Sequence, residues 1–467
     1  MEDYSDIMIT RKHINEFNKK SGFKKILAFR DLWGITVGLM ISGLFFEWSQ
    51  ALRFVKPGSL LILISGIFLF YILYMPVLSR LAVSYPYAGG GYAYSRIAFG
   101  SFWGFMTGIL KVGEFACITG VLLSYLESYL KMLHIPMADY VKMLIFAILM
   151  VFHSTGTKKT VFLQLLVTTI GISALLLLFM GIDTTGALSF VELTEPSHLP
   201  YGMAGALPFV LWLFLGIDVT VLTVEETKNP GKQIPLAFLA SLLMLLFLLL
   251  GTILICLACV PAIFLAGASF PLHRILMLLQ EDDKVLQAVF SFLSLSAFLA
   301  GVNAGLIGYS RQVFSLGRAG YLPSVLGKIH EKSKAPYAAV FSSALALLLS
   351  GFFPAISLIK MACFFALISY LLTALSYFPL VIRKMKKGKR RVLQKGMVGL
   401  VLLMCAVGFF GMLFLNLLLF GIFSGILILA AVYYLAVGKK KVNQDAPEEV
   451  EANSERINII ITDMIKS

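Results

Sequence analysis

Ionisable side chains inside long apolar stretches are the residues most suited to chemistry. Lys111 and Glu114 lie one helical turn apart in one stretch, and Asp218 and Glu47 lie in two others. A charged group in such a stretch costs roughly 3 kcal/mol to place in a bilayer, so each is a candidate functional residue. At this spacing Lys111 and Glu114 can form an ion pair. That pair is either structural or part of a proton-linked switch, and Asp218 is either functional or bonded to a neighbouring helix.

Glycine and serine interrupt the stretch that also holds Glu47. Gly34 and Gly38 form a small-xxx-small pair that suits close helix packing, whereas adjacent Ser42 and Gly43 lower helix propensity. Freed backbone groups in a membrane must line a cavity, so a break here would create a binding site. N–H groups of the outer half-helix would face a carboxylate, and carbonyls ending the inner half-helix would accept from an ammonium. The residues alone leave both interpretations open, a packing face and a broken helix.

Composition decides the class of protein that must position these groups. The chain has 467 residues, of which 59% are hydrophobic and 14% charged. A soluble globular domain carries roughly 25% charged residues, so we expect a polytopic membrane protein. An ordinary soluble enzyme, a disordered protein and a small secreted scaffold are excluded. The five cysteines lie inside apolar runs, so we predict no disulfide framework, no metal site and no cofactor.

Continuous apolar stretches predict an all-α fold, because the strands of a membrane barrel would alternate polar and apolar residues. A helix needs about 20 apolar residues to cross a bilayer. The acidic, polar residues after Lys441 predict a mostly flexible end. Between a tail over 1–30 and a tail over 438–467, we expect twelve transmembrane helices at 31–53, 59–83, 101–132, 139–155, 159–181, 204–226, 233–260, 285–311, 336–353, 355–382, 397–418 and 420–437.

Basic residues set the expected orientation. The net charge is +14, and Lys and Arg concentrate in the segments that share a side with the N-terminus when twelve helices alternate. Such segments are normally cytoplasmic, so we predict a multi-pass protein with both termini in the cytoplasm. The same distribution argues against a nucleic-acid partner. The basic run over 383–391 can attract anionic membrane lipid, although orientation is its simpler role.

The first and sixth stretches both contain glycine-bearing polar spots, and they lie five stretches apart. Since five is odd, two such copies enter the membrane from opposite sides, which is typical of inverted repeats in transporters. Asn303, in the eighth stretch, either lines a pathway or bonds a backbone group. Sodium coupling would need several oxygen ligands near the first and eighth stretches. Only Ser294, Ser296 and Asn303 offer them there, so coupling to protons is favoured.

Four motifs together resemble the amino acid–polyamine–organocation permease superfamily over about residues 30–385. They are Ile41-Ser42-Gly43, the loop over 86–90, the segment 214–230 with its Glu225-Glu226-Thr-Lys-Asn-Pro ending, and the segment 310–323. The pattern Ile-Ser-Gly-x-x-Phe-x-Trp, ending at Trp48, looks most like ethanolamine-permease and related bacterial amino acid permeases. This sequence departs from the family pattern at two places that bear on which substrate is bound. Glu47 replaces an expected small residue, and Gly216-Ile-Asp218 replaces the more usual Gly-x-Glu.

The resemblance implies a five-plus-five inverted repeat, with repeats about 31–181 and 204–382 and additional helices about 397–437. Substrate would lie between the broken first and sixth helices. The backbone from Gly38 through Ile41, Ser42 and Gly43 would hold one end of it, Phe214 would form an aromatic lid, and Gly216 would expose backbone. Asp218 would sense protons or gate, with Glu114, Lys111, Glu47 and Asn303 as further coupling candidates.

We therefore expect a non-enzymatic secondary transporter of amino acids or small amines that works by alternating access in a bacterial cytoplasmic membrane. It is expected to be proton-coupled or exchange-driven, and to be a monomer or a homodimer. The alternative is a membrane receptor that binds such a solute without moving it. A membrane-embedded hydrolase is disfavoured because the chain has no recognisable nucleophile or metal motif.

Overall fold

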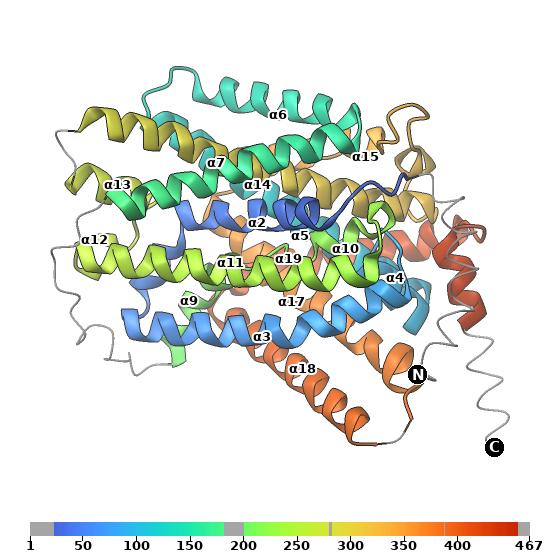
Figure 1. Ribbon diagram of the computed structural model, residues 1–467. Helices are drawn as coiled ribbons and strands as arrows, with labels where there is room; N and C mark the ends of the chain where they lie inside the picture. Colours follow the sequence, from blue (N-terminus) through green and yellow to red (C-terminus); the bar gives the residue numbers. More distant parts are fainter. Residues whose placement is uncertain (1–22, 182–199, 280–282, 387, 456–467) are drawn as a thin grey trace.

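The computed structural model describes residues 23–181, 200–279, 283–386 and 388–455, and these residues form a bundle of helices running alongside one another (Figure 1). Within the described ranges, β-type pairing consists of one isolated parallel bridge between Leu27 and Thr227. The predicted all-α membrane fold is confirmed.

Eight helices are long and apolar enough to cross a membrane, and each falls on a predicted stretch. Two of them begin at a proline, where the missing N–H would have had no helical partner. They are α3 (Pro57–Ser84), α5 (Ser101–Met132), α7 (Thr157–Gly181), α11 (Pro230–Cys259), α14 (Lys284–Arg318), α17 (Ala355–Tyr377, continued by η5, Phe378–Ile382), α18 (Lys389–Leu415) and α19 (Leu417–Ala436).

The other four predicted stretches carry shorter or interrupted helices, and the count of twelve crossings stays a prediction. They are α2 (Phe29–Phe45) with η2 (Trp48–Arg53), α6 (Ala138–Ser154), α9 (Pro200–Trp212) with α10 (Val219–Leu222), and α15 (Tyr337–Phe341) with α16 (Ala344–Phe352). The connecting elements are α4 (Gly91–Phe99), η3 (Val224–Glu226), α12 (Ala262–Leu265), α13 (Pro271–Leu279), η4 (Ser324–Gly327) and η6 (Gly438–Lys440).

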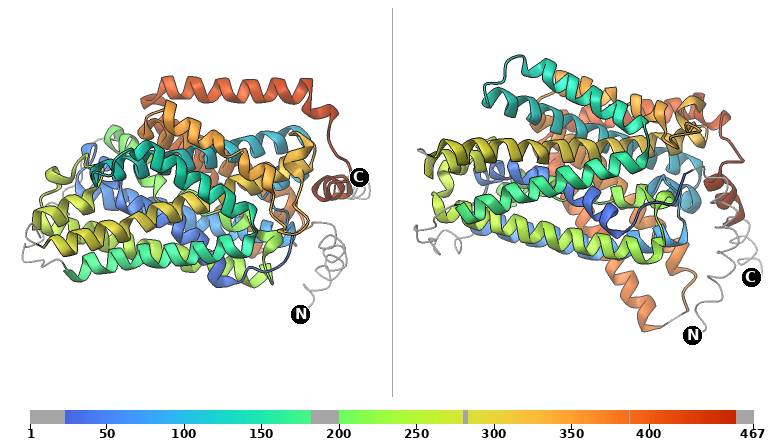
Figure 2. Two further views of the ribbon diagram at one scale, coloured as in Figure 1. Left: turned by 90° about the horizontal axis from the view of Figure 1, so that it is seen from above. Right: turned by 45° about the horizontal axis from the view of Figure 1, so that its top comes forward.

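Burial separates a central group of helices from a peripheral one. The most apolar window of α5 is 78% buried inside the protein, whereas that of α19 is only 11% buried. α5 packs against α4, α14 and α17, and α2 packs against α7, α11 and α14. Figure 2 shows α19 running along the outside of the bundle. The elements that hold the predicted site residues are therefore those most shielded from the surroundings.

The first helix is interrupted, but at a different place from the one predicted. α2 continues through Ser42 and Gly43, and the break falls at Phe46, whose backbone is extended, and Glu47, whose φ is +67°. Ser42 stays helical because its hydroxyl donates to the carbonyl oxygen of Leu39, 2.6 Å away. A Cβ on Gly43 would lie 3.2 Å from the indole nitrogen of Trp212, so this glycine permits close packing of two segments rather than ending a helix.

The sixth stretch is interrupted where the sequence predicted. α9 ends at Trp212, the backbone then makes successive turns through Leu213–Asp218, and α10 begins at Val219. Gly216 has a φ of +79°, in the left-handed region that only glycine enters at no cost. The two interruptions thus lie five predicted spans apart, as the inverted repeat requires.

Candidate functional site

The two interrupted segments lie against each other in the middle of the bundle. The hydroxyl oxygens of Thr36 and Thr220 are 2.6 Å apart. A Cβ on Gly216 would lie 2.3 Å from a methyl carbon of Leu39, so only glycine allows this approach. A void of about 10 Å³ remains, lined by Leu39, Met40, Gly43, Ile118, Leu122, Trp212 and Leu215. That volume is on the scale of one water molecule, so the site is closed around itself in this conformation.

Backbone polar groups are free on both sides of this void. The last four carbonyls of α2, from Ser42 to Phe45, have no helical partner because the helix ends there. Among the described residues, the N–H groups of Gly216, Ile217 and Asp218 have no hydrogen-bond acceptor. Donors and acceptors without a partner in the described ranges are therefore concentrated where the two helices are broken.

Three other α2 residues predicted to bind substrate, Gly38, Ile41 and Ser42, pack against α7 or α14 instead of lining the void. A Cβ on Gly38 would collide with the side chains of Gln164 and Thr168 on α7. The Ile41 side chain lies against Gly171, and the Ser42 hydroxyl faces Gly301. Gly43 is thus the predicted α2 residue that lines the void.

Phe214, the predicted aromatic lid, is fully buried in the interrupted sixth segment. Its ring stacks on Tyr71 of α3, with centroids 5.5 Å apart and planes inclined by 15°. This stacking anchors the segment Leu213–Asp218 to α3 in the closed conformation. Movement of the lid would have to break it.

Three of the predicted ionisable residues meet in one buried cluster. Lys111 Nζ lies 2.6 Å from Glu114 Oε2 and also contacts Asp218 Oδ2. The ammonium lies 4.3 Å from the ring centre of Tyr370, whose hydroxyl donates to Glu114 Oε1 at 3.3 Å. Tyr71 in turn donates to the Tyr370 hydroxyl at 3.4 Å.

The charge balance of this cluster is its main chemical property. Two carboxylates share one ammonium, so the fully ionised cluster carries one excess negative charge in a buried place. Asp218 Oδ1 has no hydrogen-bond partner among the described residues. Since an isolated buried charge is costly, one added positive charge, either a proton or a cationic group, would balance this cluster. Tyr71 and Tyr370, which come from α3 and α17, were not among the predicted site residues.

Glu47 does not join this cluster. It stands at the break of the first helix with 1% of its surface exposed. Neither carboxylate oxygen has a hydrogen-bond partner within the described chain. It does not line the small void, and its role as a coupling candidate stays a prediction.

Asn303 bonds neighbouring helices. Its Nδ2 donates to Gln164 Oε1 at 2.6 Å and to the carbonyl of Thr160 at 3.3 Å, and its Oδ1 lies 2.7 Å from His153 Nε2. Gln164 Nε2 then donates to the carbonyls of Gly34 on α2 and Ala300 on α14. The Gln164 amide thus uses carbonyl oxygens of both α2 and α14 as hydrogen-bond acceptors.

The serines considered as sodium ligands bond within their own helix. Ser294 Oγ donates to the carbonyl of Phe290, and Ser296 Oγ donates to that of Leu293. Among the described residues, no group of three or more His, Cys, Asp or Glu side chains is arranged to hold a metal ion.

Buried ion pairs close one end of the bundle, which we call the arginine end; it is defined by Arg96, Arg311 and Arg318. Glu226, just after α10, lies 3.0 Å from Arg311 Nε on α14. Glu225 accepts two hydrogen bonds from Arg318, at 2.8 and 3.0 Å. The segment that follows the broken sixth helix is therefore tied to the end of α14.

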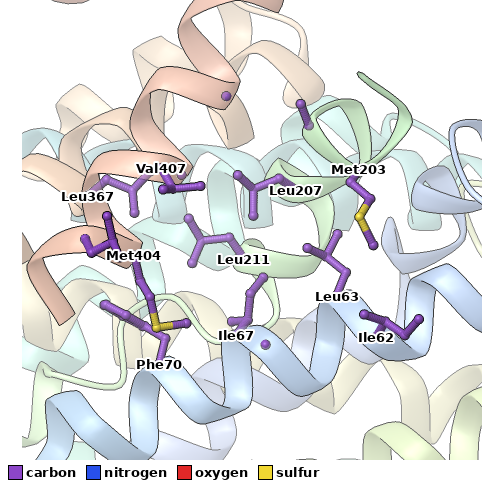
Figure 3. Close-up of a pocket in the computed structure, with 15 residues that line it drawn as sticks. Ile62, Leu63, Ile67, Phe70, Met203, Leu207, Leu211, Leu367, Met404 and Val407 are labelled. Carbon is purple, nitrogen blue, oxygen red and sulfur yellow. The ribbon is translucent and has the colours of Figure 1, made fainter. Parts of the chain in front are cut away.

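A larger cavity, of about 620 Å³, lies between α3, α9 and α18 (Figure 3). Its walls are glycines and apolar side chains, including those of Ile67, Phe70, Met203 and Val407. Its lining residues carry no polar or charged side chain, in contrast to the cluster beside the interrupted helices.

Interrupted helices that meet at a buried charged cluster, inside an apolar helical bundle, define a multi-pass membrane transporter. Residues 32–453 match the family model for amino acid permeases, so the chain belongs to that family. The predicted superfamily is thereby confirmed, and the nearer likeness to ethanolamine permeases stays a prediction.

Several curated proteins are similar over most of the chain. An uncharacterized transporter, R00093, of Rhizobium meliloti (strain 1021) is 26% identical over 68% of this chain and 70% of its own length. The branched-chain amino acid permease BcaP of Lactococcus lactis subsp. cremoris (strain MG1363) is 22% identical over 84% and 89%. Cationic amino acid transporter 1 of Arabidopsis thaliana is 25% identical over 75% and 62%. These names indicate transport rather than enzymatic catalysis.

Proposed function

We propose that this protein is a secondary active transporter that moves amino acids or small amines across a bacterial cytoplasmic membrane by alternating access. The observation that carries the proposal is the contact between the two interrupted helices beside the Lys111–Glu114–Asp218 cluster. Membership of the amino acid permease family supports the same substrate class. The arginine end faces the cytoplasm in this proposal, and both termini lie on that side.

The substrate binds between the end of α2 and the turns of Leu213–Asp218. Its ammonium donates to the free carbonyls that end α2 near Gly43, where the negative end of the helix dipole favours a cation. Its carboxylate accepts from free backbone N–H groups beside the breaks. Because the void holds about 10 Å³, side chains that line it, such as Trp212 and Leu215, must move to admit the substrate.

Proton coupling works through Asp218. This residue directly precedes α10, so a change in its charge acts on the mobile part of the sixth helix. When Asp218 is protonated, Lys111 keeps Glu114 as its partner and the cluster becomes neutral. When Asp218 loses the proton, its carboxylate contacts Lys111 and draws α10 toward α5. Glu47 and Asn303 remain candidates for proton coupling or gating.

Uptake into proteoliposomes tests this function. Purified protein is reconstituted, and accumulation of labelled amino acids and amines is measured with and without an inward proton gradient. We expect at least one substrate to accumulate only with the gradient. Absence of uptake for every amino acid and amine would reject the proposal. A ligand that raises the melting temperature yet never accumulates would instead indicate a receptor.

The role of Asp218 is tested by Asp218→Asn, with Asp139→Asn as the matched control because Asp139 is exposed. Asp218→Asn is expected to fold and to exchange substrate across the membrane without gradient-driven accumulation. Asp139→Asn should behave as wild type. Full accumulation by Asp218→Asn would remove Asp218 from the coupling mechanism.

A further inference from the structure

The C-terminal acidic residues are docked, which corrects the prediction of a mostly flexible end. We call residues 443–455 the tail segment; within it, the described residues 447–455 are helical. Pro447 begins this helix, where its fixed φ and missing N–H are favourable. Glu448 and Glu449 follow directly, and both are fully buried (0% exposed) against the arginine end. Their burial needs cationic partners from the body of the protein.

Glu449 joins α4 to the residues that follow α14. Arg96 donates to Glu449 Oε2 through Nε at 2.7 Å, and its Nη2 lies 2.5 Å from the same oxygen. The hydroxyl of Tyr321 donates to Glu449 Oε1 at 2.9 Å, and that of Tyr92 does so at 3.3 Å. One carboxylate therefore receives hydrogen bonds from two separate parts of the bundle.

Glu448 shares an arginine with the broken sixth helix. Arg318 Nε donates to Glu448 Oε1 at 3.3 Å, and Nη2 lies 3.0 Å from the other oxygen. The same guanidinium binds Glu225, as described above. The tail segment thus adds a second carboxylate to the ion pair that ties the sixth helix to α14.

The main chain at the start of the tail segment fits the same surface. The N–H of Asn443 donates to the carbonyl of Ala319 at 2.9 Å, and its side-chain amide donates to that of Arg318 at 3.2 Å. Gly320 has a φ of +83°, and a Cβ there would lie 2.1 Å from the carbonyl oxygen of Lys441. The turn after α14 is shaped to receive this chain, and docking does not depend on charge alone.

These contacts cross parts that must separate during transport. If substrate leaves through the arginine end, Glu225 has to move away from Arg318, and α4 has to move relative to the end of α14. Glu449 bridges α4 and the residues after α14, and Glu448 shares Arg318 with Glu225 at the other boundary. Because desolvation offsets much of the attraction in a buried ion pair, such docking is reversible.

We propose that the tail segment is an autoinhibitory strap, which holds the arginine end closed and limits the transport rate until it undocks. The strap rests on the proposed transport function but concerns its regulation. In the docked state the arginine end has a low probability of opening. Undocking leaves Glu225–Arg318 and Glu226–Arg311 as the pairs that still close it.

Glu449→Gln tests the strap in the full-length reconstituted protein. It keeps the side-chain shape and removes the charge opposite Arg96. Asp445→Asn is the matched control, since it changes the same charge at an exposed position in the same segment. We expect the initial uptake rate of Glu449→Gln to rise about fivefold or more, the lower end of typical coupling between sites, and that of Asp445→Asn to stay at the wild-type value.

A second variant covers the case in which Glu449→Gln fails to fold. Ala452 is fully buried under the tail helix, so Ala452→Gln should lift the segment without altering any charged partner. It is expected to raise the uptake rate as Glu449→Gln does. Wild-type or lower rates in every variant that folds would overturn the strap.

Hydrogen exchange separates this proposal from the proposed function. In lipid nanodiscs without substrate, peptides over 85–99 and 318–322 should exchange faster in Glu449→Gln and Ala452→Gln than in wild type. Unchanged exchange in both variants would overturn the strap even if transport is observed. If the wild-type protein moves no substrate, the transport proposal fails, and the exchange measurement still decides whether the tail holds this end closed.

Discussion

Removing Lys111 is the most informative single perturbation of the buried cluster. Lys111→Met keeps much of the length of the side chain and removes the ammonium that serves both Glu114 and Asp218. The three side chains are at most 5% exposed, so water cannot replace the lost partner without a change in structure. Two carboxylates would then remain together in an apolar bundle.

The expected loss of stability follows from this geometry. Breaking a buried ion pair by removing one partner costs about 3–5 kcal/mol, because the remaining charge is uncompensated. With an unfolding entropy of about 2.1 cal/mol/K per residue, a chain of 467 residues loses roughly 1 °C of melting temperature per kcal/mol. Lys111→Met should therefore melt about 3–5 °C below wild type.

Thermal unfolding in detergent, followed by intrinsic fluorescence, measures this shift. The triple variant Lys111→Met/Glu114→Gln/Asp218→Asn removes all three charges and should recover most of the loss. Lys131→Met is the control for an ion pair at the surface, since Lys131 is about half exposed, and it should melt close to the wild-type temperature. A Lys111→Met protein that melts with wild type, or a triple variant as unstable as the single one, would refute the assignment of a mutually compensating cluster.

Three further predictions concern other parts of the site. Gly216→Ala places a residue with a side chain at φ +79°, which costs about 1–2 kcal/mol, and brings its Cβ within 2.3 Å of Leu39. Uptake should therefore be lost. Normal uptake would contradict the close approach of the two breaks. Arg311→Gln and Glu226→Gln should show a coupling energy of at least about 1 kcal/mol in a double-mutant cycle of thermal unfolding, and additive effects would contradict a buried pair. Replacing sodium by potassium should leave uptake unchanged, because the Gln164 amide bridges α2 and α14, and a clear fall would show that sodium takes part.

The long helices could be predicted from the sequence because each is specified locally. A continuous run of apolar residues is enough to identify a crossing segment such as α11, whatever it packs against. Buried charges were identifiable for a related reason. Lys111, Glu114 and Asp218 are costly wherever their helices lie in a membrane, so their presence alone signals a role. That Asp218 meets Lys111 across two helices needed the structure.

The position of the first break could not be read from local propensity. Ser42 and Gly43 are weak helix formers, yet the helix continues through both. Gly43 is a glycine because Trp212 lies against it, a contact made 169 positions along the chain and therefore invisible locally. The break instead falls at Phe46, whose ring stacks between Tyr125 and Phe298, so aromatic packing from two other helices fixes it.

Docking of the tail segment was missed for a physical reason of the same kind. Acidic, polar residues at a chain end normally stay in water, because nothing compensates their burial. Glu448 and Glu449 are buried since Arg318 and Arg96, over 120 residues earlier in the chain, supply the compensating charges. The sequence of the tail alone does not indicate that those arginines lie against it.

The two ends of the bundle are closed by different kinds of interaction. At the break of the first helix, Ser49 Oγ donates to the carbonyl of Ala268 at 2.7 Å and Gln50 Nε2 donates to that of Gly267 at 3.1 Å. Each neutral bond of this kind contributes about 0.5–1.5 kcal/mol net. The arginine end is closed by buried ion pairs, whose attraction is strong but whose charges regain their hydration as soon as water enters.

When the arginine end opens, its charged side chains lose their ion-pair partners but regain water as a partner. Opening therefore replaces one favourable interaction of these charges with another. The net difference is a small remainder of two large terms, which makes it sensitive to a single added partner such as Glu448 on Arg318. Asp218 directly precedes α10, the element that moves in the proposed mechanism. A proton on Asp218 would remove one buried negative charge from the cluster beside α10, and we propose that this change shifts the balance between the two ends.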